Sequence, residues 1–131
     1  MLAGFLAPVK SGPAFGAALV ACCVAAVCAS ATPGHVFEVT YNPGTGTSTW
    51  VDRSYDFGDL PVTDLVRDDV TGDLYAASDF GVALLPAGTT HWVLAAPGMP
   101  FVEVAGLTII PNQRILYAAT HGLSAWRLNL D

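Results

Sequence analysis

The chain has 131 residues, of which 53% are hydrophobic and 12% are charged, and its formal net charge is -6 with the histidines neutral. This composition excludes an intrinsically disordered chain, which needs low hydrophobicity and high charge. Nucleic-acid binding is excluded as well, because five basic residues against eleven acidic ones cannot form a basic face along a phosphate backbone.

The first 31 residues form an apolar leader. They contain Lys10, no acidic residue, an Ala/Val/Cys-rich run over residues 14–29 and a small-residue triplet at 29–31. This layout is typical of a secretory signal peptide, and cleavage after Ala31 would leave Thr32 as the new N-terminus. We therefore predict a secreted or cell-envelope protein, either extracellular or periplasmic.

Three alternatives for the leader remain open. The tetrapeptide LVAC at residues 19–22 resembles a bacterial lipobox, in which Cys22 would carry a lipid anchor. An uncleaved membrane anchor is shorter here than the roughly 20 residues that span a bilayer, and a misassigned start is the third alternative. We expect membrane contact only through the leader or a lipid at Cys22. All three cysteines lie in the leader, so a disulfide framework, a zinc-thiolate site and a thiol nucleophile are excluded from the remainder.

From residue 35 onward, short β-branched or aromatic runs alternate with turns rich in Gly, Pro, Asn and Asp. No window of a dozen residues keeps the apolar period of a helix. The sequence therefore predicts an all-β domain over residues 32–131. The expected strands are 35–41, 47–53, 61–66, 73–78, 81–85, 90–95, 102–110, 114–120 and 123–130.

An internal repeat of 42 residues indicates the architecture. The segment LYAAS at 74–78 recurs as LYAAT at 116–120, and Trp50 and Trp92 have the same separation. A four-stranded propeller blade has about 40–45 residues. We therefore predict about two and a half four-stranded antiparallel blades of a β-propeller.

The expected blades are a blade end at 35–53, a full blade at 60–95 and an incomplete last blade at 99–130. A closed propeller needs at least about four blades. We expect the chain to be a C-terminal fragment, a truncated product, or a piece that assembles with the remaining blades or with copies of itself. In self-association, segment 47–53 of another copy would supply the missing fourth strand beside 123–130.

These residues resemble the BNR or Asp-box propeller repeat of sialidase-like, xyloglucanase-like and sortilin-like proteins. The resemblance covers about residues 34–130 and is carried by LPVTDLV, GDLYAASDFGV and the terminal ILYAATHGLSAWRL. The family box S-x-D-x-G-x-[ST]-W keeps only its Trp and Thr49 in the copy that ends at Trp50, and only its Trp in the copy that ends at Trp92.

The resemblance implies one of two functions. The first is a non-catalytic segment of an exported propeller that binds a glycan or a protein. The second is the C-terminal part of a propeller glycoside hydrolase, sialidase- or xyloglucanase-like, whose catalytic residues lie outside this chain. Fold alone does not decide between them.

Most aromatic and alanine residues of the repeat are expected to pack between blades. Trp126 lies on what is expected to be an edge strand, and it is a candidate platform for stacking a carbohydrate. The residues expected between blades are Trp50, Trp92, Tyr75, Tyr117 and the Ala-Ala pairs at 76–77 and 118–119.

Polar residues give a short set of candidates. Asp64, Asp79 and Glu103 lie nearest the expected strand ends, and a glycosidase would need two carboxylates about 5 to 9 Å apart. We take Asp64 and Asp79 as carbohydrate-binding candidates and assign no catalytic residue. The four arginines are far apart in sequence, and no family motif places them in the substrate-binding cluster of a sialidase.

The segment DDVTGD at 68–73 is either a calcium-binding loop or, as we favour, a tight turn in which Asp and Gly supply the turn conformations. The three histidines are expected in hairpins or on the surface, because their spacing does not match a zinc site. No cofactor or metal is predicted.

Overall fold

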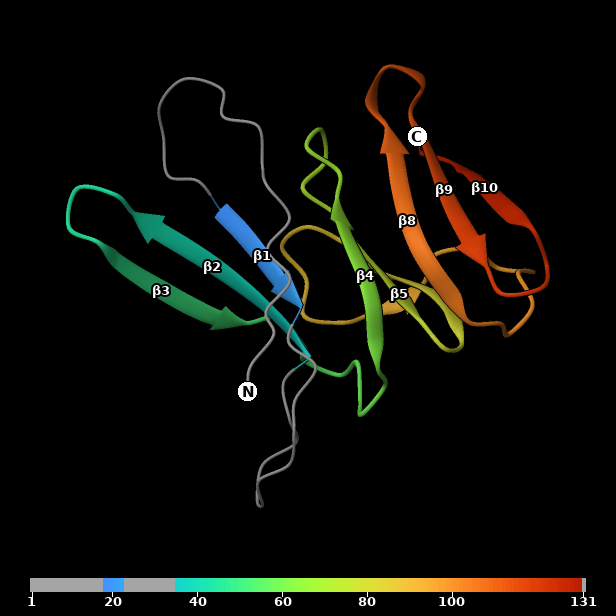
Figure 1. Cartoon of the computed structure of the whole chain (residues 1–131), viewed down its shortest axis with the longest axis horizontal. Helices are drawn as coiled ribbons and strands as arrows, with labels where there is room; N and C mark the ends of the chain where they lie inside the picture. The colour runs from blue at the N-terminus through green and yellow to red at the C-terminus, as the bar shows by residue number, and fades with distance from the viewer. Residues whose placement is uncertain (1–17, 23–34, 131) are drawn as a thin grey trace.

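The computed structural model describes residues 18–22 and 35–130, which form antiparallel β-sheets (Figure 1). The predicted all-β class is confirmed. Within the described residues, the single helical element is the 3-10 turn η1 (Pro111–Gln113). The strands are β1 (Ala18–Cys22), β2 (Val36–Asn42), β3 (Thr47–Asp52), β4 (Val62–Arg67), β5 (Leu74–Ser78), β6 (Gly81–Leu85), β7 (Val93–Leu94), β8 (Val104–Ile110), β9 (Ile115–Thr120) and β10 (Ala125–Asn129).

Three sheets lie side by side in chain order (Figure 1). The N-terminal sheet has the strand order β1-β2-β3, the central sheet β4-β5-β6-β7 and the C-terminal sheet β10-β9-β8. Each sheet is a meander in which consecutive strands pair antiparallel.

The sequence repeat is also a repeat of strand register. In the central sheet, Val62 pairs with Ser78, and the register shifts between Val62 and Asp64. In the C-terminal sheet, Val104 pairs with Thr120 and the shift falls between Val104 and Gly106, 42 residues later. The two sheets therefore share one bulged strand pair, built twice from the same pattern.

Two apolar clusters join the sheets. The larger one packs Tyr75, Ala77 and Val82 of the central sheet against Leu107 and Leu116 of the C-terminal sheet. The smaller one consists of buried Val36, Phe57, Val62 and Ala76, and joins the N-terminal sheet to the central one. Tyr75, Ala76 and Ala77 are all buried, as predicted, because small side chains in β5 let neighbouring sheets approach closely.

The N-terminal sheet corrects the predicted strand count. We expected two strands before the full blade, but β1 adds a third by pairing with β2 from Ala18↔Thr40 to Cys22↔Val36. Five residues of the expected leader thus form an edge strand, and the rest of the leader lies outside the described residues. In the part of the chain that the structure describes, no helix is long and apolar enough to cross a membrane.

The predicted burial of Trp50 and Tyr117 between sheets is wrong. Trp50 is 54% exposed, because β3 is an outer edge with every residue exposed. Tyr117 is 37% exposed, although its repeat mate Tyr75 is buried. The reason is that Tyr75 faces the C-terminal sheet, whereas no further sheet follows the C-terminal one among the described residues.

Candidate functional site

Asp64 links two sheets through its carboxylate. It lies at the bulge of β4, where its Oδ1 accepts the amide of Leu65 at 2.8 Å and its Oδ2 accepts the amide of Leu107 in β8 at 2.7 Å. The neighbouring Thr63 hydroxyl donates to the carbonyl of Val104, also in β8. Both oxygens of Asp64 thus accept backbone amides. The bond to Leu107 connects the central sheet to the C-terminal sheet, so Asp64 has a structural role.

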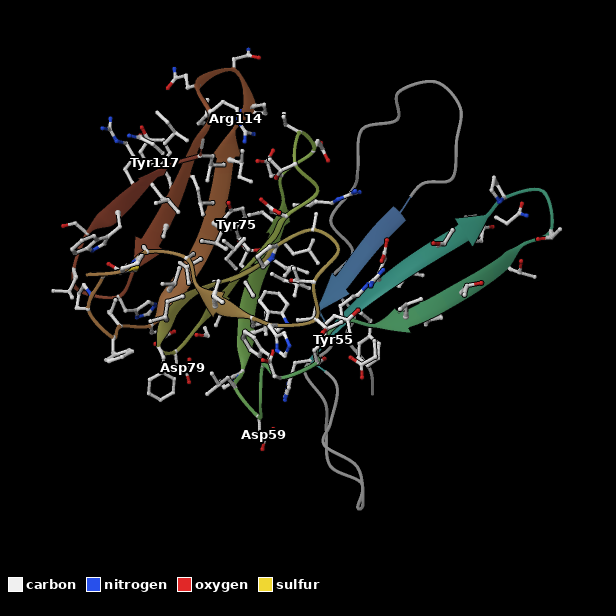
Figure 2. All side chains as sticks on the ribbon, turned by 180° about the vertical axis from the view of Figure 1, so that it is seen from behind. Tyr55, Asp59, Tyr75, Asp79, Arg114 and Tyr117 are labelled. Carbon is white, nitrogen blue, oxygen red and sulfur yellow. The ribbon has the colours of Figure 1, made fainter. Side chains whose placement is uncertain are left out.

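Asp79 is the second predicted carbohydrate-binding carboxylate. Figure 2 shows it in the β5–β6 turn, at the same end of the sheets as Asp59 and at the opposite end from Arg114. Its side chain is exposed and has no hydrogen bond or ion pair with any described residue. The turn itself is held by Ser78, whose hydroxyl donates to the carbonyl of Gly81 and accepts the amide of Phe80.

Trp126 lines an apolar groove between the central and C-terminal sheets. The indole is 39% exposed on β10, and the groove of about 30 Å³ is lined by Ala95, Met99 and Ala118 among others. A role of Trp126 in stacking a carbohydrate stays a prediction. The sequence did not predict the groove, because its walls come from segments that are far apart in the chain.

The buried member of the DDVTGD segment is Asp68. Its carboxylate accepts hydrogen bonds from Arg114 Nη1 at 2.6 Å, from the amide of Val70 at 3.0 Å and from the hydroxyl of Thr71 at 3.2 Å. The bond to Arg114 is the main cause that lowers the pKa of Asp68 to about 2. The segment forms the turn between β4 and β5, as favoured from the sequence. No three His, Cys, Asp or Glu side chains cluster as metal ligands in the described part.

Arg114 has an unusual backbone. Its φ of 53° lies in the left-handed region, in the turn between η1 and β9. The equivalent residue one repeat earlier is Gly72, with φ of 83°. Arginine thus occupies a turn position that favours glycine, and its side chain reaches the equivalent turn of the central sheet.

Two histidines pair with aspartates that lie in the connection between β3 and β4. His35 is buried and its Nε2 lies 3.0 Å from Asp59 Oδ1, which corrects the expectation of a surface position. His91 Nδ1 lies 2.9 Å from Asp56 Oδ2. The amide of Trp92 also donates to Asp56, and this bond, followed by the one from His91, lowers the pKa of Asp56.

The third histidine, His121, lies in the β9–β10 turn with Nε2 3.7 Å from Glu103 Oε1. Its amide donates to the carbonyl of Glu103 at 3.0 Å. Each described histidine therefore fixes a connection between strands.

The structure brings together two arginines that are far apart in sequence. Arg53 and Arg67 both line a cleft of about 320 Å³ between the N-terminal and central sheets. Arg53 donates to Glu38 Oε2 at 2.6 Å and to the hydroxyl of Tyr55 at 2.7 Å, and these bonds, that of Tyr55 first, raise its pKa. Arg67 forms no ion pair within the described residues, so it is the cation of this cleft that is open to an anionic or hydroxyl-bearing ligand.

Comparison of the chain with family models, with curated proteins and with solved structures found no match.

Proposed function

We propose that the chain is a non-catalytic segment of an exported propeller of the BNR/Asp-box type, which acts as a scaffold for binding a glycan or a protein. The observation that carries this proposal is the shared register of the central and C-terminal sheets at a spacing of 42 residues. On this interpretation the central sheet is one complete blade and the C-terminal sheet contributes three strands of the next.

The placement of the carboxylates supports binding over catalysis. A general acid or nucleophile needs a carboxylate oxygen directed at the substrate. Both oxygens of Asp64 accept backbone amides, and Asp79 is a solvated turn residue. The half-exposed Trp126 and the cleft beside Arg67 instead offer surfaces for recognition.

One observation favours a second function, that of a part of a propeller glycoside hydrolase with catalytic residues outside this chain. Arg53 and Arg67 line the same cleft, and a sialidase-like enzyme uses several arginines to bind the substrate carboxylate. Arg53 is already paired with Glu38, which leaves one arginine for such a role.

An activity screen and a binding screen with the full chain test the proposal. We expect hydrolysis of sialosides, xyloglucan and related glycosides at the rate of buffer alone. Any glycan binding should be lost in Trp126→Ala and kept in Tyr117→Ala, a matched control because Tyr117 is also a partly exposed aromatic residue of the C-terminal sheet. Turnover that disappears in Asp79→Asn would overturn the non-catalytic assignment, since that exposed residue has no described contact whose loss would unfold the protein.

A further inference from the structure

The outer edge of β10 has no partner strand among the described residues. The C-terminal sheet ends at β10, whereas the equivalent strand of the central sheet, β6, is followed by β7. β7 pairs with β6 through Ala83↔Leu94 and Leu84↔Val93. An edge of this kind presents unpaired amide and carbonyl groups to any strand that can reach it.

The central sheet shows what a fourth strand brings to this position. Trp92, next to β7, packs edge-on against Phe57 at a centroid distance of 5.1 Å, and its Nε1 donates to the carbonyl of Arg53 at 3.0 Å. It also packs against the cluster that includes Ala76, and Ala83 is a further neighbour of that cluster. One tryptophan thereby closes the space between two sheets.

The residues around Trp92, called here the Trp92 seat, have equivalents one repeat later. By position in the repeat, Arg53, Phe57 and Ala76 correspond to Ala95, Met99 and Ala118. All three of the later residues line the apolar groove beside β10. The groove is therefore the counterpart of the Trp92 seat, next to an edge without its fourth strand.

The Trp92 seat and its counterpart beside β10 differ at one residue, and this residue determines how much space is left. The position of Ala83 is occupied by Trp126, because the β9–β10 turn is longer than the β5–β6 turn. Trp126 fills part of this counterpart and leaves a groove of about 30 Å³, too small to hold a second indole. An incoming aromatic side chain must therefore lie across the exposed face of Trp126.

The chain itself contains a strand suited to this edge. β3 precedes the central sheet as β7 precedes the C-terminal one, and Trp50 is the repeat mate of Trp92. Every residue of β3 is exposed, and its outer edge is unpaired within the described residues. Trp50 itself is 54% exposed, at the edge opposite to β1.

We propose that β3 of a second copy of this chain pairs antiparallel with β10, so that Trp50 of that copy lies across Trp126. This proposal rests on the proposed blade architecture. If β3 adopts the register that β7 has on β6, Asp52 lies opposite Trp126 and Val51 lies opposite Arg127. Trp50 is then the diagonal neighbour of Trp126, within reach for two aromatic side chains.

This pairing joins the C-terminal sheet of one copy to the N-terminal sheet of the other in the strand order β8-β9-β10-β3-β2, and β1 extends that sheet in a chain that keeps its leader. Because the two edges are different surfaces, the contact is head-to-tail, and successive copies form a ring if the rotation between them closes and an open filament if it does not. The binding mode is strand addition at an exposed sheet edge, in which backbone hydrogen bonds give affinity and side chains fix the register.

Sedimentation velocity of the full chain at several concentrations is the first test. The average mass should rise with concentration, and Trp50→Ser should weaken association at least about tenfold, as is typical for loss of a central interface tryptophan. Tyr41→Ser is the matched control, since Tyr41 is 47% exposed on the same hairpin but lies on β2, away from the pairing edge. Association through the apolar leader would be equal in both variants, and that result would overturn the proposal.

Disulfide trapping tests the register directly. In a chain whose Cys22, Cys23 and Cys28 are replaced by serine, a Val51→Cys variant is mixed with an Arg127→Cys variant under mild oxidation. The proposed register places these two residues opposite each other, which suits a disulfide. We expect a cross-linked heterodimer from this mixture and none when Thr47→Cys replaces Val51→Cys, because four residues along a strand move the thiol by about 13 Å.

The outcomes separate this inference from the proposed function. A chain that stays monomeric at all concentrations, or equal trapping of Val51→Cys and Thr47→Cys, overturns the strand pairing and leaves the binding scaffold in place. A chain that associates as expected but hydrolyses a glycoside overturns the proposed function and leaves the strand pairing in place.

Discussion

Asp68 connects two equivalent turns of neighbouring sheets, and its charge is part of the stability of the fold. The side chain is 2% exposed and pairs with Arg114 Nη1 at 2.6 Å. Its pKa in the folded protein is about 2, below the ordinary value of 3.8. A lowered folded pKa means that the ionised carboxylate stabilises the fold above pH 4, by about 2 kcal/mol. This contribution is lost as the pH falls from about 4 to about 2.

The first prediction is that Asp68→Asn lowers the free energy of unfolding by about 2–3 kcal/mol at pH 7, because Arg114 loses its charged partner. Urea denaturation between pH 7 and pH 2 should also show a flatter acid limb for this variant than for the wild type. Asp69→Asn is the control, since Asp69 is the adjacent carboxylate and is exposed. Equal losses in the two variants would mean that the ion pair adds nothing beyond the charge of the turn.

At the scale of strands, the two repeat-mate tryptophans have different surroundings. Trp92 packs on Phe57 and donates its Nε1 hydrogen to Arg53, whereas Trp50 lies on an exposed edge with Phe37 at a centroid distance of 6.4 Å. We predict that Trp92→Ala lowers the free energy of unfolding by about 3 kcal/mol and Trp50→Ala by less than about 1 kcal/mol. Chemical denaturation at low protein concentration, where copies do not associate, measures both. Similar losses would indicate that β3 is covered in solution.

The leader presents a conflict between export and the N-terminal sheet. Signal-peptide cleavage after Ala31 would remove β1, which pairs with β2 over five residue pairs. We predict that the exported protein begins at Thr32, or at Cys22 if it is lipidated, and that the inner edge of β2 then lacks this strand. N-terminal sequencing of the exported protein is the measurement. An intact Met1 on soluble cytosolic protein would contradict both forms of export and would mean that the residues of β1 stay in the chain.

The strands could be predicted from the sequence because local patterns determine them. Alternating β-branched residues and Gly- or Asp-rich turns located β2 to β10 to within a few residues, and the repeat of Tyr75 at Tyr117 revealed the common register. The neighbours of each strand could not be predicted in this way. Tyr75 and Tyr117 have the same local sequence, and only the presence of a following sheet buries the first and exposes the second.

The contacts of the candidate site residues could not be predicted either, because they join segments that are distant in sequence. Asp64 was selected as a carboxylate near a strand end, but one of its two partners is the amide of Leu107, which is 43 residues away. Arg53 and Arg67 line one cleft between two sheets, and Asp68 pairs with Arg114, which is 46 residues away in sequence. The repeat was the feature of the sequence from which the contact between Asp68 and Arg114 could have been predicted, because residues in equivalent turns of adjacent units are neighbours in a stacked architecture.

At the scale of the molecule, the central sheet makes more extensive contacts with the C-terminal sheet than with the N-terminal sheet. The larger apolar cluster joins the central and C-terminal sheets, and β4 and β8 are further linked through Asp64 and Thr63. The N-terminal sheet is joined through the smaller cluster around Val36 and Phe57, and residues 40–52 beyond that cluster are all exposed. In repeat architectures each unit is stabilised by its contacts with its neighbours, so the β2–β3 hairpin should be the first part to open.

The last prediction follows from this difference in contacts between the sheets. In hydrogen exchange of the full chain at low concentration, amides of residues 40–52 should exchange at least about a hundredfold faster than those of β5 and β9, because opening the hairpin exposes little apolar surface. β5 and β9 are the middle strands that the larger cluster covers, so their exchange requires separation of two sheets. Raising the protein concentration should slow exchange in β3 and β10 together, since each strand protects the other in the proposed pairing. Slow exchange of the hairpin in dilute Trp50→Ser protein would contradict this order, because that variant removes the aromatic contact between copies and leaves only contacts within one chain.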